Sequence, residues 1–177
     1  MKSMLVKHIV TLSASAILLA SSLAVTAQAT ASDDDKKFVE TALKGGMSEV
    51  DLGQLAARAG KSADVKQFGQ MMVKDHTRLG TKMKTVAGQI GVTPPSTQSA
   101  DGLATKAKLE VLSGDSFDKA YISAMVKDHE EDLADFKKEE ENGSSPAVKA
   151  AAKQGEAVIS HHLAMIKKIA AAHNVTE

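Results

Sequence analysis

The chain contains no cysteine and no tryptophan, and among its 177 residues there are only one tyrosine and four phenylalanines. The absence of cysteine excludes disulfides, thiol catalysis and a lipid-modified N-terminal cysteine. Because aromatic residues make up 3% of the chain and the formal net charge is +0, there are few side chains to stack on bases and no basic excess for phosphates. We therefore expect no nucleic-acid partner, and a core of Leu, Ile, Val, Met and Ala, which favours helices.

The first 29 residues are typical of a cleaved signal peptide. Lys2 and Lys7 form a positively charged start, the segment from Ile9 to Val25 is apolar, and Ala27-Gln28-Ala29 matches a small-x-small cleavage site, although cleavage after Ala31 fits equally well. The apolar segment falls short of the roughly 20 residues that span a membrane comfortably, so we expect no stable membrane span after cleavage. The sequence predicts a periplasmic or secreted protein.

Cleavage after residue 29 leaves residues 30–177, which have the size of one ordinary domain. Removing Lys2 and Lys7 reduces the 22 basic residues to 20 against 22 acidic residues, so the formal net charge of the mature chain becomes −2. Neither size nor charge indicates an oligomeric state or a protein partner.

Four long stretches show the apolar spacing of three and four residues that is typical of amphipathic helices. They run from the Ser32–Asp35 cluster to Gly60, from Ser62 to about Ile90, from about Ser116 to Asn142-Gly143, and from Pro146 to about Ala172. Between the second and third, residues 91–115 are long enough to cross the whole bundle and include a short helix from Leu103 to Leu112. The pattern predicts an all-α, up-down four-helix bundle with a long crossover that carries a short extra helix.

Three details of the first two helices carry their own expectations. Gly45-Gly46 in its middle predicts a kink or the close approach of a neighbouring helix. The inward-facing line of this helix is expected to include Glu49 and to end at Ala59. Ser62 is expected to cap the second helix.

A five-residue phrase, Met-Val-Lys-Asp-His, occurs at residues 72–76 and again at residues 125–129. In both copies the histidine, His76 or His129, falls on the apolar stripe of its helix and is predicted to point inward. A buried imidazole needs a hydrogen-bond partner or a metal, because a stranded polar group costs roughly 1–3 kcal/mol.

The other two long helices each place one polar residue on the inward stripe, Glu49 on the first and His162 on the fourth. Glu49, His76, His129 and His162 all lie about 13–16 residues from the predicted start of their helix, near its midpoint. A midpoint keeps its level whichever way a helix runs, so these four side chains are predicted to meet in one layer. Three imidazoles and a carboxylate suit a single transition-metal ion, flanked by Asp75, Asp128 and His161.

The same residues also fit a second interpretation, a buried polar network in which Glu49 pairs with a protonated histidine and Asp75 or Asp128 orients the others. Methionines such as Met165, four residues after His161, are soft copper ligands in principle but more often fill cores. The acidic run from Glu130 to Glu141 is expected to form a solvated helix face.

Several short motifs follow one another in a specific order along the mature chain. They are Phe38 to Ala56 with its segment Glu49 to Ala56, Val65 to Phe68, Asp75-His76, Phe117 to Tyr121, His129 and His162-Leu163. In this arrangement the chain resembles the exported bacterial family called domain of unknown function 4142, over essentially the whole mature sequence. The resemblance implies a ferritin-like four-helix bundle in the periplasm or cell envelope, with no settled biochemical role.

The residues three positions before the histidines are Val73, Val126 and Ile159, so the Glu-x-x-His pairs of di-iron proteins with a ferritin-like fold are absent. This disfavours ferroxidase or oxygenase chemistry, and the sequence shows no phosphate loop, dinucleotide fingerprint or nucleophile elbow. An enzymatic activity is therefore not predicted. Two hypotheses follow: a metal-binding envelope protein, or a non-enzymatic envelope stress or interaction module with structural histidines.

Overall fold

A computed structural model describes residues 30–176, so the predicted signal peptide lies outside the described residues. The regular elements of the described part are α1 (Asp33–Ala59), α2 (Ala63–Gln89), α3 (Ala100–Glu110), α4 (Gly114–Asn142) and α5 (Pro146–Ala172). These bounds agree with the predicted ones to within about three residues. None of these five helices is both long enough and apolar enough to cross a membrane.

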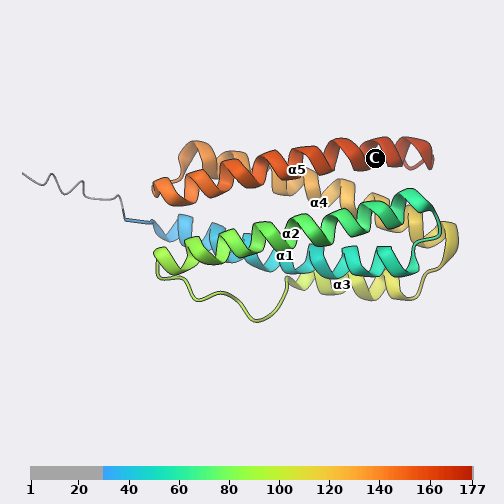
Figure 1. Cartoon of the computed structure of the whole chain (residues 1–177), viewed down its shortest axis with the longest axis horizontal. Helices are drawn as coiled ribbons and strands as arrows, with labels where there is room; N and C mark the ends of the chain where they lie inside the picture. The colour runs from blue at the N-terminus through green and yellow to red at the C-terminus, as the bar shows by residue number, and fades with distance from the viewer. Residues whose placement is uncertain (1–29, 177) are drawn as a thin grey trace, which may run out of the picture.

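The four long helices form two antiparallel pairs, α1 with α2 and α4 with α5, which pack against each other (Figure 1). The connection between α2 and α4 returns along the bundle, with α3 lying beside α1, so α2 and α4 run in the same direction (Figure 1). This arrangement confirms the predicted ferritin-like four-helix bundle with a long crossover and a short extra helix.

The acidic start of α1 is hydrogen-bonded to the turn between α4 and α5 at the same end of the bundle (Figure 1). Ser32 and Asp35 form a capping box, in which the Asp35 amide donates to Ser32 Oγ at 3.1 Å and the Ser32 amide donates to the Asp35 carboxylate at 2.6 Å. Asp35 also accepts a hydrogen bond of 2.9 Å from the amide of Ser144, in the turn between α4 and α5. Asp35 therefore both caps α1 and holds a turn that is 109 residues away in the sequence.

The start of α2 differs from the sequence-based expectation. The Ser62 side chain accepts no hydrogen bond from the first turn of α2. Instead, the carboxylate of Asp118 on α4 accepts hydrogen bonds from the backbone amides of Lys61 and Ser62, at 2.8 and 2.9 Å. Asp118 is 1% exposed, and its two part-buried hydrogen bonds tie the α1–α2 turn to the second helix pair.

The apolar interior is divided into two clusters. One includes Phe68, Phe117, Tyr121 and Ile166, and the other includes Val39, Met83, Phe136 and Ile159. On every long helix a buried polar residue lies between members of the two clusters: Glu49 between Leu43 and Leu52, His76 between Met72 and Met83, His129 between Val126 and Phe136, and His162 between Ile159 and Ile166. A polar layer therefore separates the two apolar clusters of the bundle.

The glycines that allow close helix packing are not the predicted ones. A Cβ atom at Gly45 or Gly46 would meet no atom of a neighbouring element within 4 Å, and α1 runs through both residues without a break. The close approach lies two turns further along, where a Cβ on Gly53 would be 2.8 Å from the Gly69 carbonyl oxygen and a Cβ on Gly69 would be 2.6 Å from that of Gly53. Ala59, predicted to face inward, is exposed because α1 ends there.

Candidate metal centre

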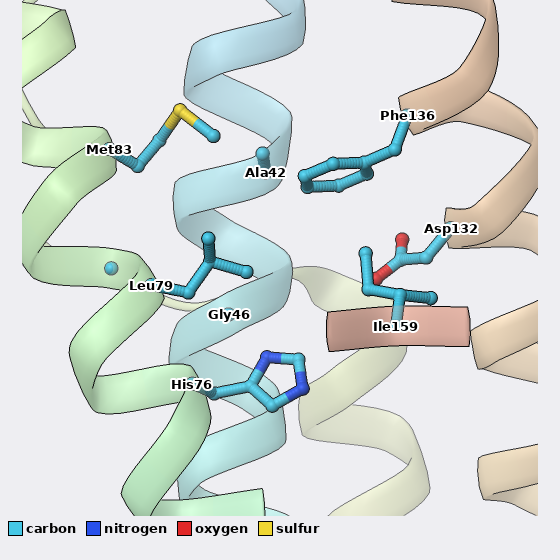
Figure 2. A pocket seen from close by; sticks show the side chains of 9 residues that line it. Ala42, Gly46, His76, Leu79, Met83, Asp132, Phe136 and Ile159 are labelled. Atoms are coloured by element: carbon cyan, nitrogen blue, oxygen red, sulfur yellow. The ribbon is translucent and has the colours of Figure 1, made fainter. Parts of the chain in front are cut away.

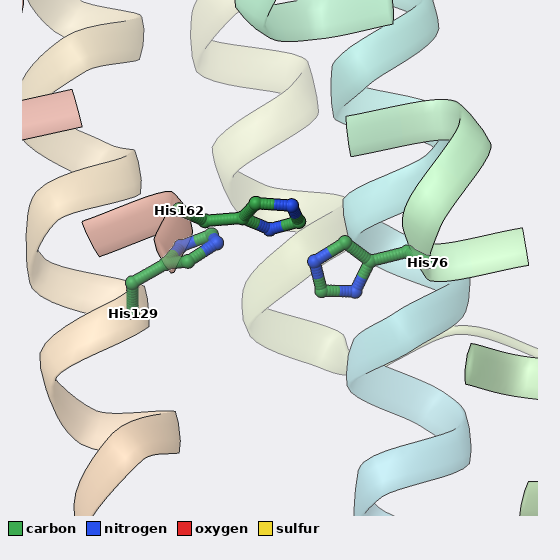
Figure 3. A group of neighbouring side chains, drawn as sticks. All are labelled: His76, His129 and His162. Carbon is green, nitrogen blue, oxygen red and sulfur yellow. The ribbon is translucent and has the colours of Figure 1, made fainter. Parts of the chain in front are cut away.

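The four polar residues predicted to form one layer are all buried, and each comes from a different long helix. Glu49 is 1% exposed, His76 3%, His129 1% and His162 0%. The three imidazole rings converge from α2, α4 and α5 (Figure 3). Their ring centres are 5.3 Å apart for His76 and His162, 5.7 Å for His129 and His162, and 5.8 Å for His76 and His129.

One ring nitrogen from each of the three histidines lies within 4.8 Å of the other two. A tetrahedral ion with metal–nitrogen bonds of about 2.0–2.1 Å would place neighbouring nitrogens about 3.3 Å apart and ring centres roughly 5 Å apart. The cluster is therefore slightly wider than a metal complex of this kind. Ring centres 5.3–5.8 Å apart would each have to move closer by less than about 1 Å to match it.

Hydrogen bonds to two of the rings define which nitrogen is free. Nδ1 of His129 is 2.9 Å from the carbonyl oxygen of Met125, which only accepts, so Nδ1 carries the proton and Nε2 has a free lone pair. Nε2 of His162 is 3.1 Å from the Asp75 carboxylate and donates to it, which leaves Nδ1 free. His129 Nε2, His162 Nδ1 and His76 Nε2 are all buried, and none has a hydrogen-bond partner among residues 30–176.

The interior also keeps these rings uncharged. Burial lowers the pKa of His129 to about 4, and it lowers the pKa of His76, where the neighbouring His129 and His162 add to the effect. Burial lowers the pKa of His162 as well, although the Asp75 carboxylate opposes the shift. Burial therefore favours the neutral imidazole, which is the form that a metal ion requires of a histidine ligand.

Glu49 belongs to a second group rather than to the imidazole trio. One of its carboxylate oxygens, one oxygen of Asp128 and one nitrogen of His129 lie within 4.8 Å of one another. Burial raises the pKa of Glu49 well above its usual value, and the adjacent Asp128 carboxyl adds to the shift. Within residues 30–176 no hydrogen bond joins Glu49 to a histidine, and its Oε2 atom has no partner.

The flanking residues occupy three different positions. Asp75 reaches across from α2 to His162 on α5, as the network interpretation had suggested for an orienting carboxylate. Asp128 is half-buried beside Glu49. His161 is exposed, with its ring centre 6.3 Å from that of His162.

Asp132 was expected on a solvated face, and this expectation is wrong. Its side chain is half-buried and lines a cavity of about 10 Å³ with His76, Phe136 and Ile159, space for about one water molecule (Figure 2). Burial raises its pKa to about 7, and the negative charge of Asp128 contributes. The signal was present in the sequence, because position 132 lies between His129 and Phe136 at the helical spacing of three and four.

A groove open to solvent lies beside the buried cluster. It has a volume of about 590 Å³, runs between α2 and α5, and is lined by residues that include Asp75, Arg78, His161 and His162. The hydrogen-bonded Asp75–His162 pair thus lies where the groove meets the buried cluster. An ion entering from this side would meet Asp75 and His162 before the other two rings.

Three solved structures are similar to this fold. A DUF305 fragment from Deinococcus radiodurans has a TM-score of 0.70 at 16% identity, with 79% of this chain and 97% of that chain covered. A DUF305 protein from Streptomyces coelicolor, described as a putative secreted protein, has a TM-score of 0.70 at 13% identity, covering 81% and 96%. CopM in the Cu(I)-bound form has a TM-score of 0.66 at 17% identity, covering 78% and 96%. At these identities the likeness shows the fold alone.

A search of curated proteins found none that matches the chain. The family model for the domain of unknown function DUF4142 matches residues 20–169. This range includes α1, α2, α3 and α4, most of α5, and every residue of the candidate centre. The chain therefore belongs to the DUF4142 family.

Proposed function

We propose that this chain is an exported metal-binding protein in which His76, His129 and His162 hold one transition-metal ion at the middle of the bundle. The observation that carries the proposal is the presence of three unpartnered imidazole nitrogens facing one another in an apolar interior. Each stranded polar atom costs roughly 1–3 kcal/mol. A layer that only fixed helix register would pair these atoms with one another, whereas one ion satisfies all three.

Copper and zinc are the ions that this donor set favours. Neutral imidazole suits zinc, copper, iron and nickel, and the general order of affinities places Cu(II) highest among divalent ions. The fold neighbour CopM was solved with Cu(I) bound, which supports copper as the first ion to test. The predicted signal peptide supports export to the periplasm or beyond, and the description of the Streptomyces coelicolor neighbour agrees with export.

Metal loading of matched histidine variants tests the proposal. The wild type and the His76→Gln, His129→Gln and His162→Gln variants are loaded with copper or zinc, desalted, and analysed for bound equivalents. His161→Gln and His173→Gln serve as controls, because His161 is exposed and His173 pairs with Asp64 away from the trio.

We expect about one equivalent in the wild type and both controls, a loss of binding in the three trio variants, and a metal-dependent rise in Tm only where metal binds. Equal metal content in all six proteins would overturn the proposal. The histidines would then be structural, and the alternative of a non-enzymatic envelope stress or interaction module would stand.

A further inference from the structure

The candidate centre contains a second set of donor atoms that the imidazole trio does not use. Glu49 on α1 and Asp128 on α4 bring carboxylate oxygens within 4.8 Å of each other and of a His129 nitrogen. Glu49 is 1% exposed, and its Oε2 atom is buried without a partner. A cation between two carboxylate groups this close would balance their charge and give the buried Glu49 oxygen a partner.

The chemistry of this set differs from that of the trio. Two carboxylate oxygens and one imidazole nitrogen form a mostly hard donor set, which suits cations such as Mn(II) better than Cu(I). The three imidazoles form a softer set that accepts Cu(I). The two groups therefore select different ions although they lie side by side.

His129 is common to both groups and has only one lone pair to give. Its Nδ1–H donates to the Met125 carbonyl oxygen, so Nε2 is the sole free donor atom of the ring. One lone pair cannot serve two ions at once. Occupancy of either position must therefore weaken binding at the other by removing His129.

We propose that Glu49, Asp128 and His129 form a second, oxygen-rich position for a hard divalent cation such as Mn(II), in competition with the three-imidazole position through the shared His129. This inference rests on the proposed function only through His129. The protein then binds one ion at a time, a soft ion among the imidazoles or a hard one between α1 and α4.

Electron paramagnetic resonance of Mn(II) tests the second position directly, because the six-line signal of free Mn(II) disappears on binding. The wild type is titrated with Mn(II) beside Glu49→Gln, Asp128→Asn and His162→Gln, with Glu40→Gln as the control. Glu40 is an acidic residue of α1 that pairs with Lys44 at the surface. Circular dichroism of each variant checks that it is folded.

We expect one bound Mn(II) in the wild type, Glu40→Gln and His162→Gln, and at least a tenfold weaker affinity in Glu49→Gln and Asp128→Asn. Cu(I), added without oxygen, is diamagnetic and should release one Mn(II) per equivalent from the wild type. In His162→Gln the same release should need at least tenfold more Cu(I), because one imidazole of the competing position is gone.

Three results would overturn the second position. The wild type binds no Mn(II), which means that the two carboxyls share only a proton. Mn(II) binds Glu49→Gln and Asp128→Asn as tightly as the wild type, which means that neither carboxylate is a ligand. Or Glu49→Gln loses Cu(I) as well, which indicates a single four-ligand site. The last result leaves the proposed metal-binding function intact. That function is overturned instead if every histidine variant still binds Cu(I).

Discussion

The Asp75 carboxylate on α2 accepts a hydrogen bond of 3.1 Å from Nε2 of His162 on α5, and this bond leaves Nδ1 of the ring free in the bundle interior. Carboxylates that hold a histidine in this way fix its tautomer and raise the basicity of the other nitrogen. Asp75 contributes no donor atom to the histidine trio. It is a positioning residue that acts through His162.

Asp75→Asn is expected to weaken copper or zinc binding about 10–100-fold while leaving the stoichiometry unchanged. Competition against a chromophoric chelator measures the affinity. The matched control is Asp64→Asn, because Asp64 on the same helix makes the same kind of bond, 3.0 Å, to His173 outside the trio. Equal losses in the two variants would show that Asp75 supports only the fold.

The buried carboxylate of Asp118 supports a prediction about stability. Asp118→Ala leaves the backbone amides of Lys61 and Ser62 without their acceptor, so it should lower the free energy of unfolding by about 2–3 kcal/mol. Urea denaturation monitored by circular dichroism measures the loss. Asp115→Ala is the control, since this exposed residue bonds only the Lys61 ammonium and should change stability by less than about 0.5 kcal/mol. A comparable loss in both variants would contradict the assigned role.

The candidate layer was predictable because each helix presents a single apolar stripe and each long helix carries one polar residue near its midpoint on that stripe. Burial of Glu49, His76, His129 and His162 follows from period and level alone. The spacing of apolar residues along the sequence does not determine how each helix is rotated about its own axis in the bundle. That rotation decides that Glu49 groups with Asp128 and His129 instead of with His76 and His162.

The contacts that sequence reasoning missed depend on pairs of helices. Asp75 lies about 100° around α2 from His76, yet it reaches His162 because α2 packs against α5 as well as α1. Asp132 was assigned to solvent with its charged neighbours, although its own spacing from His129 placed it near the core. In each case the burial and the partner of the side chain depend on which neighbouring helix packs beside the apolar stripe. The sequence pattern of a single helix does not determine this.

The glycines of α1 and α2 provide a test of the close helix crossing. Gly69→Ala places a Cβ 2.6 Å from the Gly53 carbonyl oxygen, so α1 and α2 must move apart, and stability should fall by about 1–3 kcal/mol. Gly45→Ala is the matched control in a neighbouring helix, where no atom of another element lies within 4 Å of the new methyl group. It should raise stability by about 0.5–1 kcal/mol, because alanine favours helices. Thermal and urea unfolding of both variants measure the contrast, and a stable Gly69→Ala protein would contradict the crossing.

The carboxyl pair formed by Asp35 and Glu139 makes stability depend on pH. Burial and the hydrogen bond to Asp35 raise the pKa of Glu139 to about 7, from 4.5. For Asp35, burial alone would raise the pKa, but hydrogen bonds from Ser32, Glu139 and Ser145 prevail and lower it to about 2. Glu139 therefore stays protonated in the folded protein over a range where the unfolded chain has already lost the proton.

A group whose folded pKa is raised contributes stability that is fully present below its unfolded pKa and is lost as the pH rises through the folded value. The contribution of Glu139 should be complete below about pH 4.5 and gone above about pH 7. Glu139→Gln keeps an amide donor for Asp35 at every pH. Its stability relative to the wild type should therefore increase between pH 5 and pH 8, by about 1 kcal/mol or less because the site is partly open to solvent.

Urea denaturation of both proteins at the two pH values measures this difference, and Glu141→Gln is the control because Glu141 is exposed on the same helix turn. The buried histidines affect stability in the opposite direction. Their contribution to the free energy of unfolding is lost as the pH falls from about 6.5 towards the folded pKa of about 4 for His129. Their contribution is common to wild type and variant and cancels in the comparison. A pH-independent difference between Glu139→Gln and the wild type would show that Asp35 and Glu139 do not share a proton in the folded protein.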